Sequence, residues 1–171
     1  MQKDTFTLIA RYNKSVNKKM NAVIKTLSPE EWKRELGGYF RSVRGLCSHL
    51  YICDFNWLKR FSGKRDFSVF KDELFGCEPY SFQDVIFDDM EEYLSKRPVL
   101  DEKIIAFTDE LKDDDININW KYIDSHGVPH ERNFGDLVFH SFNHDTFHRG
   151  MISLYLELLG RENDFSYFEI V

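Results

Sequence analysis

Apolar residues recur at steps of three and four through the first 27 positions: Ile9, Tyr12, Val16, Met20, Val23 and Leu27. This period is typical of an amphipathic helix and predicts one over about residues 4–27. Ser28, Pro29 and Glu31 follow in the N-cap, first and third positions of a helix start. They predict a second, short helix, which we expect the glycine pair at 37–38 to end.

A second long helix is predicted over about residues 40–61 from the apolar stripe Val43, Leu46, Cys47, Leu50, Trp57, Leu58 and Phe61. Residues 63–80 have no clean period and contain Gly76 and Pro79, so we expect a loop there. A third helical region is predicted over about residues 82–111. We expect Pro98 to interrupt or kink it, because proline removes a helical hydrogen bond.

Residues 116–122 alternate between apolar and polar side chains, which predicts a strand. A turn at 125–127 and a second strand over about residues 130–134 would complete a β-hairpin. The last helix is predicted over about residues 136–159, with Gly160 as its C-terminal stop. The tail, 165–171, is expected to be extended. Residues 1–171 contain neither an internal repeat nor a linker, so a single all-α domain with a small hairpin before its last helix is expected.

Composition narrows the function. The formal net charge is -6, which argues against a DNA or RNA partner. The three cysteines are an odd number without a Cys-x-x-Cys pair, which favours a reducing compartment over a disulfide framework. The N-terminus lacks the apolar segment of a signal peptide, and no apolar run has the length of a membrane span. We therefore expect a cytoplasmic protein with no membrane partner.

Two histidines on the last predicted helix suggest metal binding. His144 and His148 lie within about 20° of Leu137 on a helical projection, one turn apart on the inward stripe. Imidazoles at this spacing can reach one ion from the same side. The alternative is a pair of hydrogen-bonded core histidines, and spacing alone leaves the two interpretations balanced. His140 and His144 have the same spacing, but His140 falls about 60° off the stripe.

A third ligand has to come from another helix, and the pattern leaves four candidates open: Cys47, His49, Cys53 and Asp54. His126 and His130 fall in the predicted hairpin and are expected to be exposed. A charged side chain on a helix flank is usually surface, so we expect Asp54 to be solvated. The same reasoning makes Asp145 and Arg149 an exposed local pair. Core packing is the expected role of Tyr12.

Three segments resemble motifs of the DinB family. The first is Asn143-His144-x-x-Phe147-His148-Arg149-Gly150-Met151-Ile152 with the following Leu156-x-x-Leu159-Gly160, similar to the family's terminal N-H-x-x-H-H-R-G-Q-I motif. The second is Gly38-x-Phe40-x-Ser42, leading to His49 and to Trp57-Leu58-x-Arg60. The third is Arg11-Tyr12-Asn13 with Asn17. Together they span nearly the whole chain in the family's order.

The resemblance implies a four-helix bundle with up-down-down-up connectivity. It also implies a metal site on His49, His144 and His148, zinc or nickel as the ion, and a homodimer. Two positions depart from the pattern: Phe147 replaces the first histidine of the usual pair, and Met151 replaces a common glutamine.

Three neutral ligands would leave the coordination sphere of an ion open, as in catalytic metal sites. Similar bundles include bacillithiol- and mycothiol-dependent transferases and isomerases. The resemblance therefore implies a metal-dependent thiol S-transferase or hydrolase, with a small-molecule substrate and a low-molecular-weight thiol. The alternatives are a non-catalytic metal-binding stress-response protein and, without a metal, an interaction module.

Overall fold

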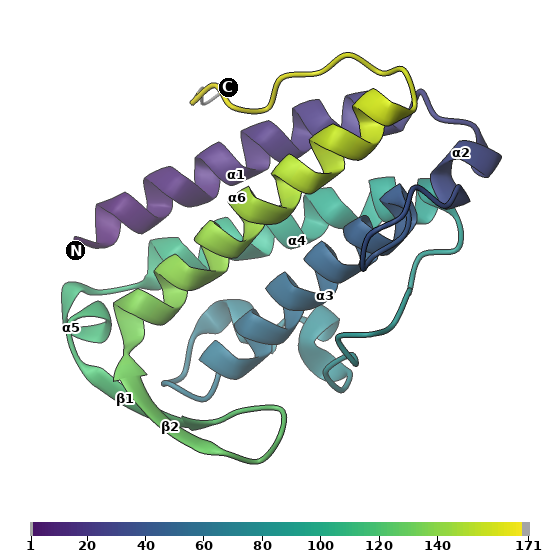
Figure 1. Cartoon of the computed structure of the whole chain (residues 1–171). Helices are drawn as coiled ribbons and strands as arrows, with labels where there is room; N and C mark the ends of the chain where they lie inside the picture. Colours follow the sequence, from purple (N-terminus) through teal and green to yellow (C-terminus); the bar gives the residue numbers. More distant parts are fainter. Residues whose placement is uncertain (1, 169–171) are drawn as a thin grey trace.

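Four long helices pack as a bundle in the computed structural model, which describes residues 2–168 (Figure 1). They are α1 (Lys3–Ile24), α3 (Val43–Phe61), α4 (Met90–Glu110) and α6 (Phe134–Leu158). α1 and α6 run in one direction and α3 and α4 in the other, which confirms the up-down-down-up connectivity. α1 and α3 each pack against α4 and α6, so α3 and α6 are direct neighbours.

Shorter elements connect the bundle: α2 (Pro29–Lys33), the 3-10 turns η1 (Ser68–Lys71) and η2 (Glu73–Gly76), α5 (Asp113–Ile116), β1 (Asn119–Ile123) and β2 (Pro129–Asn133). The strands form the predicted antiparallel hairpin, with Asn119 opposite Asn133. Gly127, at φ 79°, supplies the left-handed residue of its turn. The first strand starts later than predicted because 113–116 close a helical turn.

Capping side chains determine where several helices begin and end. Ser28 forms the predicted capping box with Glu31 at the start of α2. Ser42 accepts a hydrogen bond from Gly45 N, so α3 begins at Val43 instead of the predicted residue 40. α6 ends before Gly160, as predicted, and this glycine has the positive φ of 76° that a helix stop favours.

The prediction of helix over residues 82–89 was wrong. Ser81 and Asp84 form a local turn, in which Ser81 N donates to Asp84 Oδ2 at 3.2 Å. Asp89 then accepts from Glu91 N and caps α4. Short polar side chains bond locally to the backbone in this way and compete with a helix. Of the two effects expected at Pro98, an interruption or a kink, the interruption was wrong, since α4 continues through this residue. Residues 63–80, expected to be irregular, contain η1 and η2.

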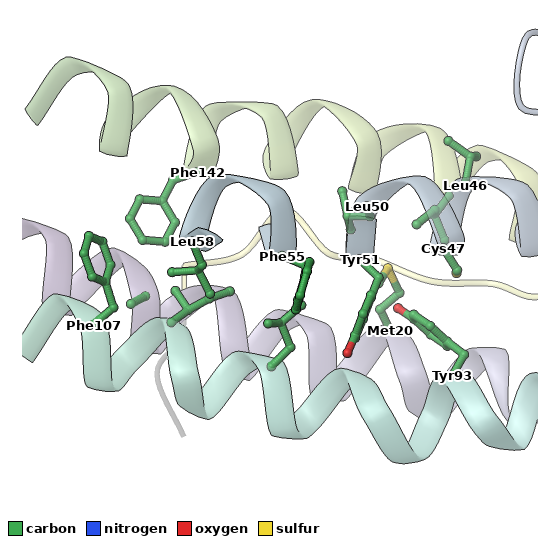
Figure 2. Packing of buried hydrophobic residues seen from close by; sticks show 14 of the residues in the cluster. Met20, Leu46, Cys47, Leu50, Tyr51, Phe55, Leu58, Tyr93, Phe107 and Phe142 are labelled. Carbon is green, nitrogen blue, oxygen red and sulfur yellow. The ribbon is translucent and has the colours of Figure 1, made fainter. Parts of the chain in front are cut away.

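Apolar side chains from all four long helices meet in one core, part of which Figure 2 shows from close by. Met20 of α1, Phe55 of α3, Phe107 of α4 and Phe142 of α6 are each at most 5% exposed. This shared core fixes α3 against α6. Among the described helices, none combines the length and the apolar character that crossing a membrane requires.

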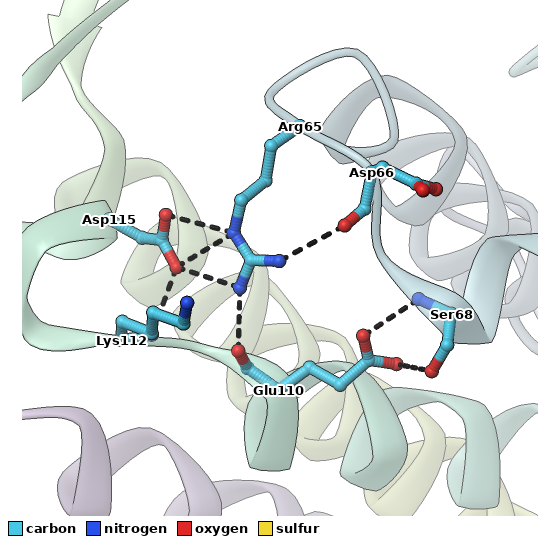
Figure 3. A network of polar contacts seen from close by, with 6 residues as sticks. All are labelled: Arg65, Asp66, Ser68, Glu110, Lys112 and Asp115. Atoms are coloured by element: carbon cyan, nitrogen blue, oxygen red, sulfur yellow. Dashed lines mark hydrogen bonds and ion pairs between the residues drawn. The ribbon is translucent and has the colours of Figure 1, made fainter.

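Arg65 attaches the segment after α3 to the end of α4 (Figure 3). Its Nη2 donates to the Glu110 carbonyl at 2.6 Å and to the Asp115 carboxylate at 2.9 Å. The Glu110 carboxylate in turn accepts from Ser68 N at 2.7 Å and from Ser68 Oγ at 2.6 Å. These bonds hold α5 in place, and the hairpin starts directly after α5.

Candidate metal centre

Three imidazoles from two helices gather at the contact between α3 and α6. Nε2 of His49 on α3 lies 3.3 Å from Nε2 of His144 on α6. The ring centroids are 4.2 Å apart for His144 and His148, and 4.7 Å apart for His49 and His148. The rings of the three histidines that the resemblance implied therefore lie near one another, but among the described residues His148 is not part of the group whose donor atoms converge.

Cys53 lies one turn after His49 and joins the group. Its Sγ is 3.5 Å from Nε2 of His49. Donor atoms of His49, Cys53 and His144 all lie within 4.8 Å of one another, so this set could hold a metal ion. In a tetrahedral shell with zinc bond lengths, two nitrogens would be ~3.3 Å apart and a nitrogen and a sulfur ~3.6 Å apart. The two spacings measured from Nε2 of His49 match that geometry.

The sequence had left four candidates for the donor on α3, and the structure separates them. Cys47 points into the core beside Tyr93, and burial raises the pKa of its thiol to about 12 (Figure 2). His49 and Cys53 face α6. The resemblance passed over Cys53, although its place one turn from His49 on the same helix was a readable signal.

Burial keeps the imidazoles neutral. Desolvation, followed by the charge of His49, lowers the pKa of His144 to about 4. Desolvation, followed by the charges of His144 and His49, lowers the pKa of His148 to about 3. The pKa of His49 is also lowered, mainly by burial. Neutral imidazoles carry the lone pair that a metal requires, so the donor set fits a divalent ion.

One ring nitrogen of this cluster has no partner in the protein. Nδ1 of His148 is buried and makes no hydrogen bond to any residue within 2–168. A buried polar atom without a partner is costly. Phe40 covers the cluster, with its ring centroid 4.3 Å from that of His49 and 5.2 Å from that of His148. The site is therefore held between helices and shielded by an aromatic ring.

Asp54, expected on the surface, is instead buried beneath the site. It is 4% exposed and accepts a 2.5 Å bond from Nη1 of Arg97, which is fully buried. The same guanidinium donates to Asp101, and Asn17 Nδ2 donates to Asp101 at 2.8 Å. The expectation failed because a stripe of apolar residues on α3 says nothing about an arginine on α4.

Asp145 and Arg149, expected to form an exposed pair, are buried and connected through Asn13 of α1. Asn13 Nδ2 donates to Asp145, and Nη1 of Arg149 donates to Asn13 Oδ1, each at 2.5 Å. Burial, followed by the charge of Asp54, raises the pKa of Asp145 well above its usual value. Sequence reasoning missed Asn13 as part of this network. The signal was a polar residue on the buried stripe of α1.

The remaining candidates lie outside the cluster. His140 is exposed, and its ring centroid is 6.4 Å from that of His144. His126 is exposed as expected, whereas His130 is half-buried because it bonds to Asp124 at 2.9 Å. Tyr12, expected in the core, is only partly buried and stacks on Phe168 at 4.3 Å.

Comparisons with known proteins identify the family. A family model described as the DinB family matches residues 1–169. The chain is similar to a protein named Protein DinB from Bacillus subtilis (strain 168), with 26% identity over 151 residues, or 87% of this chain and 83% of that protein. No solved structure matches the chain. Since the family model spans almost the whole sequence, this chain belongs to the DinB family.

Proposed function

We propose that this chain holds one divalent metal ion with His49, His144 and His148 and uses it in thiol transfer or hydrolysis of a small molecule. Two observations support the proposal: the nitrogens of His49 and His144 approach each other closely, and the neighbouring ring of His148 keeps a buried nitrogen without a partner in residues 2–168. Imidazole donors suit zinc and nickel, which are the ions we expect.

Three protein ligands would leave one position of a tetrahedral ion for a water or a thiol. An ion bound in this way acts as a Lewis acid and lowers the pKa of that ligand. The protein's own side chains would orient the donors and exclude water. Phe40 packs on two of the rings, and the bonds of Asp145 and Arg149 to Asn13 fix the helix that bears His144 and His148.

Replacing His144 by alanine tests the site. We expect His144→Ala to lose stoichiometric zinc or nickel, since a central donor is removed. His140→Ala is the matched control, one turn earlier on the same helix, and should keep its metal. Metal content of the purified variants is measured by inductively coupled plasma mass spectrometry. Full metal content in His144→Ala, or its loss in His140→Ala, would mean that other residues bind the ion.

The thiol reaction needs a separate test. Metal-loaded protein should accelerate the conjugation of cysteine or glutathione to monochlorobimane, and both metal removal and His144→Ala should abolish that acceleration. A protein that binds metal at the site yet never accelerates the transfer of these thiols would favour a role without thiol transfer.

Cys53 supports a second candidate, a metal-binding protein without turnover. Its sulfur stands at a distance from His49 that suits a fourth ligand, and four protein ligands make a closed site of the structural kind. Cobalt substitution separates the candidates. A thiolate-to-cobalt absorption band without added thiol would favour the closed site, and a band only after a thiol is added would favour the open one.

A further inference from the structure

A groove of about 970 Å³ lies beside the histidine cluster. It is lined by the second half of α3, by residues 79–83, by hairpin residues 123–126 and by Tyr39. Its volume is within the range of small-molecule sites, ~300–1,000 Å³. The residues proposed to bind the metal do not line this groove, and its lining residues determine which ligand it could bind.

Two lining residues connect the groove to the imidazoles. The ring of Tyr39 packs edge-on against Phe40 at 5.0 Å, and Phe40 lies 4.3 Å from the ring of His49. On the other wall, the Phe82 backbone lies near enough to the His49 imidazole to act on its pKa, which it raises against the larger lowering by burial. One end of the groove therefore borders the histidine cluster.

α3 forms a continuous floor between the cluster and the far end of the groove. His49, Cys53, Asn56 and Arg60 lie within about 60° on one face of the helix. Asn56 fixes the opposite wall, since its Nδ2 donates to the Tyr80 carbonyl at 2.8 Å and its Oδ1 accepts from Tyr80 N at 3.0 Å. The groove is thus a built feature with defined walls.

Arg60 brings a cation to the far end. Its guanidinium lies 4.6 Å above the ring of Trp57 and 5.6 Å from that of Tyr122. Within residues 2–168 it has no hydrogen-bond or ion-pair partner. Stacking on two aromatic rings holds the planar guanidinium group in position and leaves its N–H donors available for a ligand. Lys59 adds a second cation, whose Nζ donates to the Phe75 carbonyl at 2.7 Å.

The carboxylate that lines the groove does not neutralise Arg60. Asp124 accepts from His130 at 2.9 Å, from His126 N at 2.8 Å and from Val128 N at 2.9 Å. These bonds, with that of His130 first, lower the pKa of Asp124 to about 2. Asp124 bonds within the hairpin and not to Arg60, and the two cations Lys59 and Arg60 outnumber this one carboxylate in the lining.

We infer that the groove binds an elongated small molecule with a carboxylate or phosphate at one end, which Arg60 holds while the other end reaches the histidine cluster. The guanidinium of Arg60 lies over the ring of Trp57. Trp57 follows His49 by eight residues, which corresponds to ~12 Å along the axis of α3. The inference rests on the proposed function for what happens at the histidine end. The anion at Arg60 can be tested without any metal.

The first experiment uses metal-free, ¹⁵N-labelled protein titrated with inorganic phosphate or with succinate. We expect the indole N–H of Trp57 and the Nε–H of Arg60 to shift, while that of the fully buried Trp32 stays in place. The anion with the larger response identifies phosphate or carboxylate as the preferred group. Unchanged Trp57 and Arg60 signals with both anions would overturn the inference.

Variants locate the anion. Arg60→Gln should abolish the shift at Trp57, whereas Arg60→Lys should keep a weaker response because the charge remains without the planar fork. Arg132→Gln, the same change on an exposed hairpin residue outside the groove, should respond like the unmodified protein. An unaltered shift in a folded Arg60→Gln variant would contradict the assignment.

The second experiment uses metal-loaded protein and measures the span. Suberate, an eight-carbon dicarboxylate, can bridge Arg60 and the cluster, whereas succinate is too short. We expect suberate to bind ~10-fold more tightly by calorimetry, and Arg60→Gln to lose this advantage with its metal content unchanged. Equal affinities for suberate and succinate would contradict a ligand that spans from Arg60 to the histidine cluster. Anion binding at Arg60 in a protein that takes up no metal would contradict the proposed function and leave the anion site intact.

Discussion

His148 illustrates how one residue constrains the chemistry of this protein. It is 5% exposed, its pKa is lowered to about 3, and one ring nitrogen has no partner within 2–168. A core histidine that served packing alone would be expected to bond both nitrogens. Its position beside His49 and His144 suggests a role for this nitrogen, because a metal ion can accept an imidazole lone pair without protonation of the ring.

A substitution of Cys53 distinguishes a metal site that includes its sulfur from one that does not. We expect Cys53→Ser to keep stoichiometric metal, because three imidazoles remain, and to be unchanged in the cobalt spectrum before thiol is added. Cys77→Ser, at an exposed cysteine, is the control. Metal content and absorption of the cobalt-substituted proteins are the measurements. Loss of the ion from Cys53→Ser alone would make the sulfur a required ligand and favour the closed site.

At the scale of elements, a buried ion network joins the helices that carry the site. Arg97 of α4 holds Asp54 of α3 and Asp101, and Asn17 of α1 bonds to Asp101. Three helices therefore meet through one guanidinium that is fully buried. Such a network adds little net stability over an apolar core, but removing one partner leaves charges buried without compensation.

Arg97→Met should lower the free energy of unfolding by ~3–5 kcal/mol, because Asp54 and Asp101 would lose their cation. Lys96→Met is a closely matched control, since Lys96 precedes Arg97 and forms an ion pair with Glu92 at 2.7 Å on the exposed face. That change should cost ~0–1 kcal/mol. Urea denaturation of both variants provides the comparison, and similar losses would show that the buried network does not join the helices energetically.

For the whole molecule, the buried histidines couple stability to pH in the metal-free state. The folded-state pKa values of His144 and His148, about 4 and about 3, lie below the ordinary value of 6.5. The unfolded chain therefore binds more protons between pH 6.5 and 3. This contribution to stability is fully present above pH 6.5 and is lost as the pH falls through that window.

We expect the stability of the metal-free protein to decrease from pH 7 to pH 4.5 by a larger amount than that of His148→Leu, which lacks one of the two groups. His126→Ala, at an exposed histidine, should follow the unmodified protein. Denaturant midpoints across this pH range in the presence of EDTA are the measurement. Parallel pH profiles for the unmodified protein and His148→Leu would contradict a contribution of the His148 imidazole to this pH dependence.

The sequence by itself determined the four long helices, the hairpin and the inward pair His144 and His148. These follow from local rules: apolar periodicity, capping residues such as Ser28 and Gly160, and the i,i+4 spacing of helical side chains. The resemblance to the DinB family added His49, which the periodicity of α3 could not separate from its neighbours. It also implied the order of the helices in space.

Only the tertiary structure decided what these elements bring together. It placed Cys53 beside His49 and His144, buried Asp54 against Arg97, and turned Phe40 onto the imidazoles. It also formed the groove at Arg60 from segments that are distant in the sequence. Each of these contacts joins residues from separate elements, and no local pattern encodes such a partner. Burial, charge compensation and ligand geometry arise only when the helices pack.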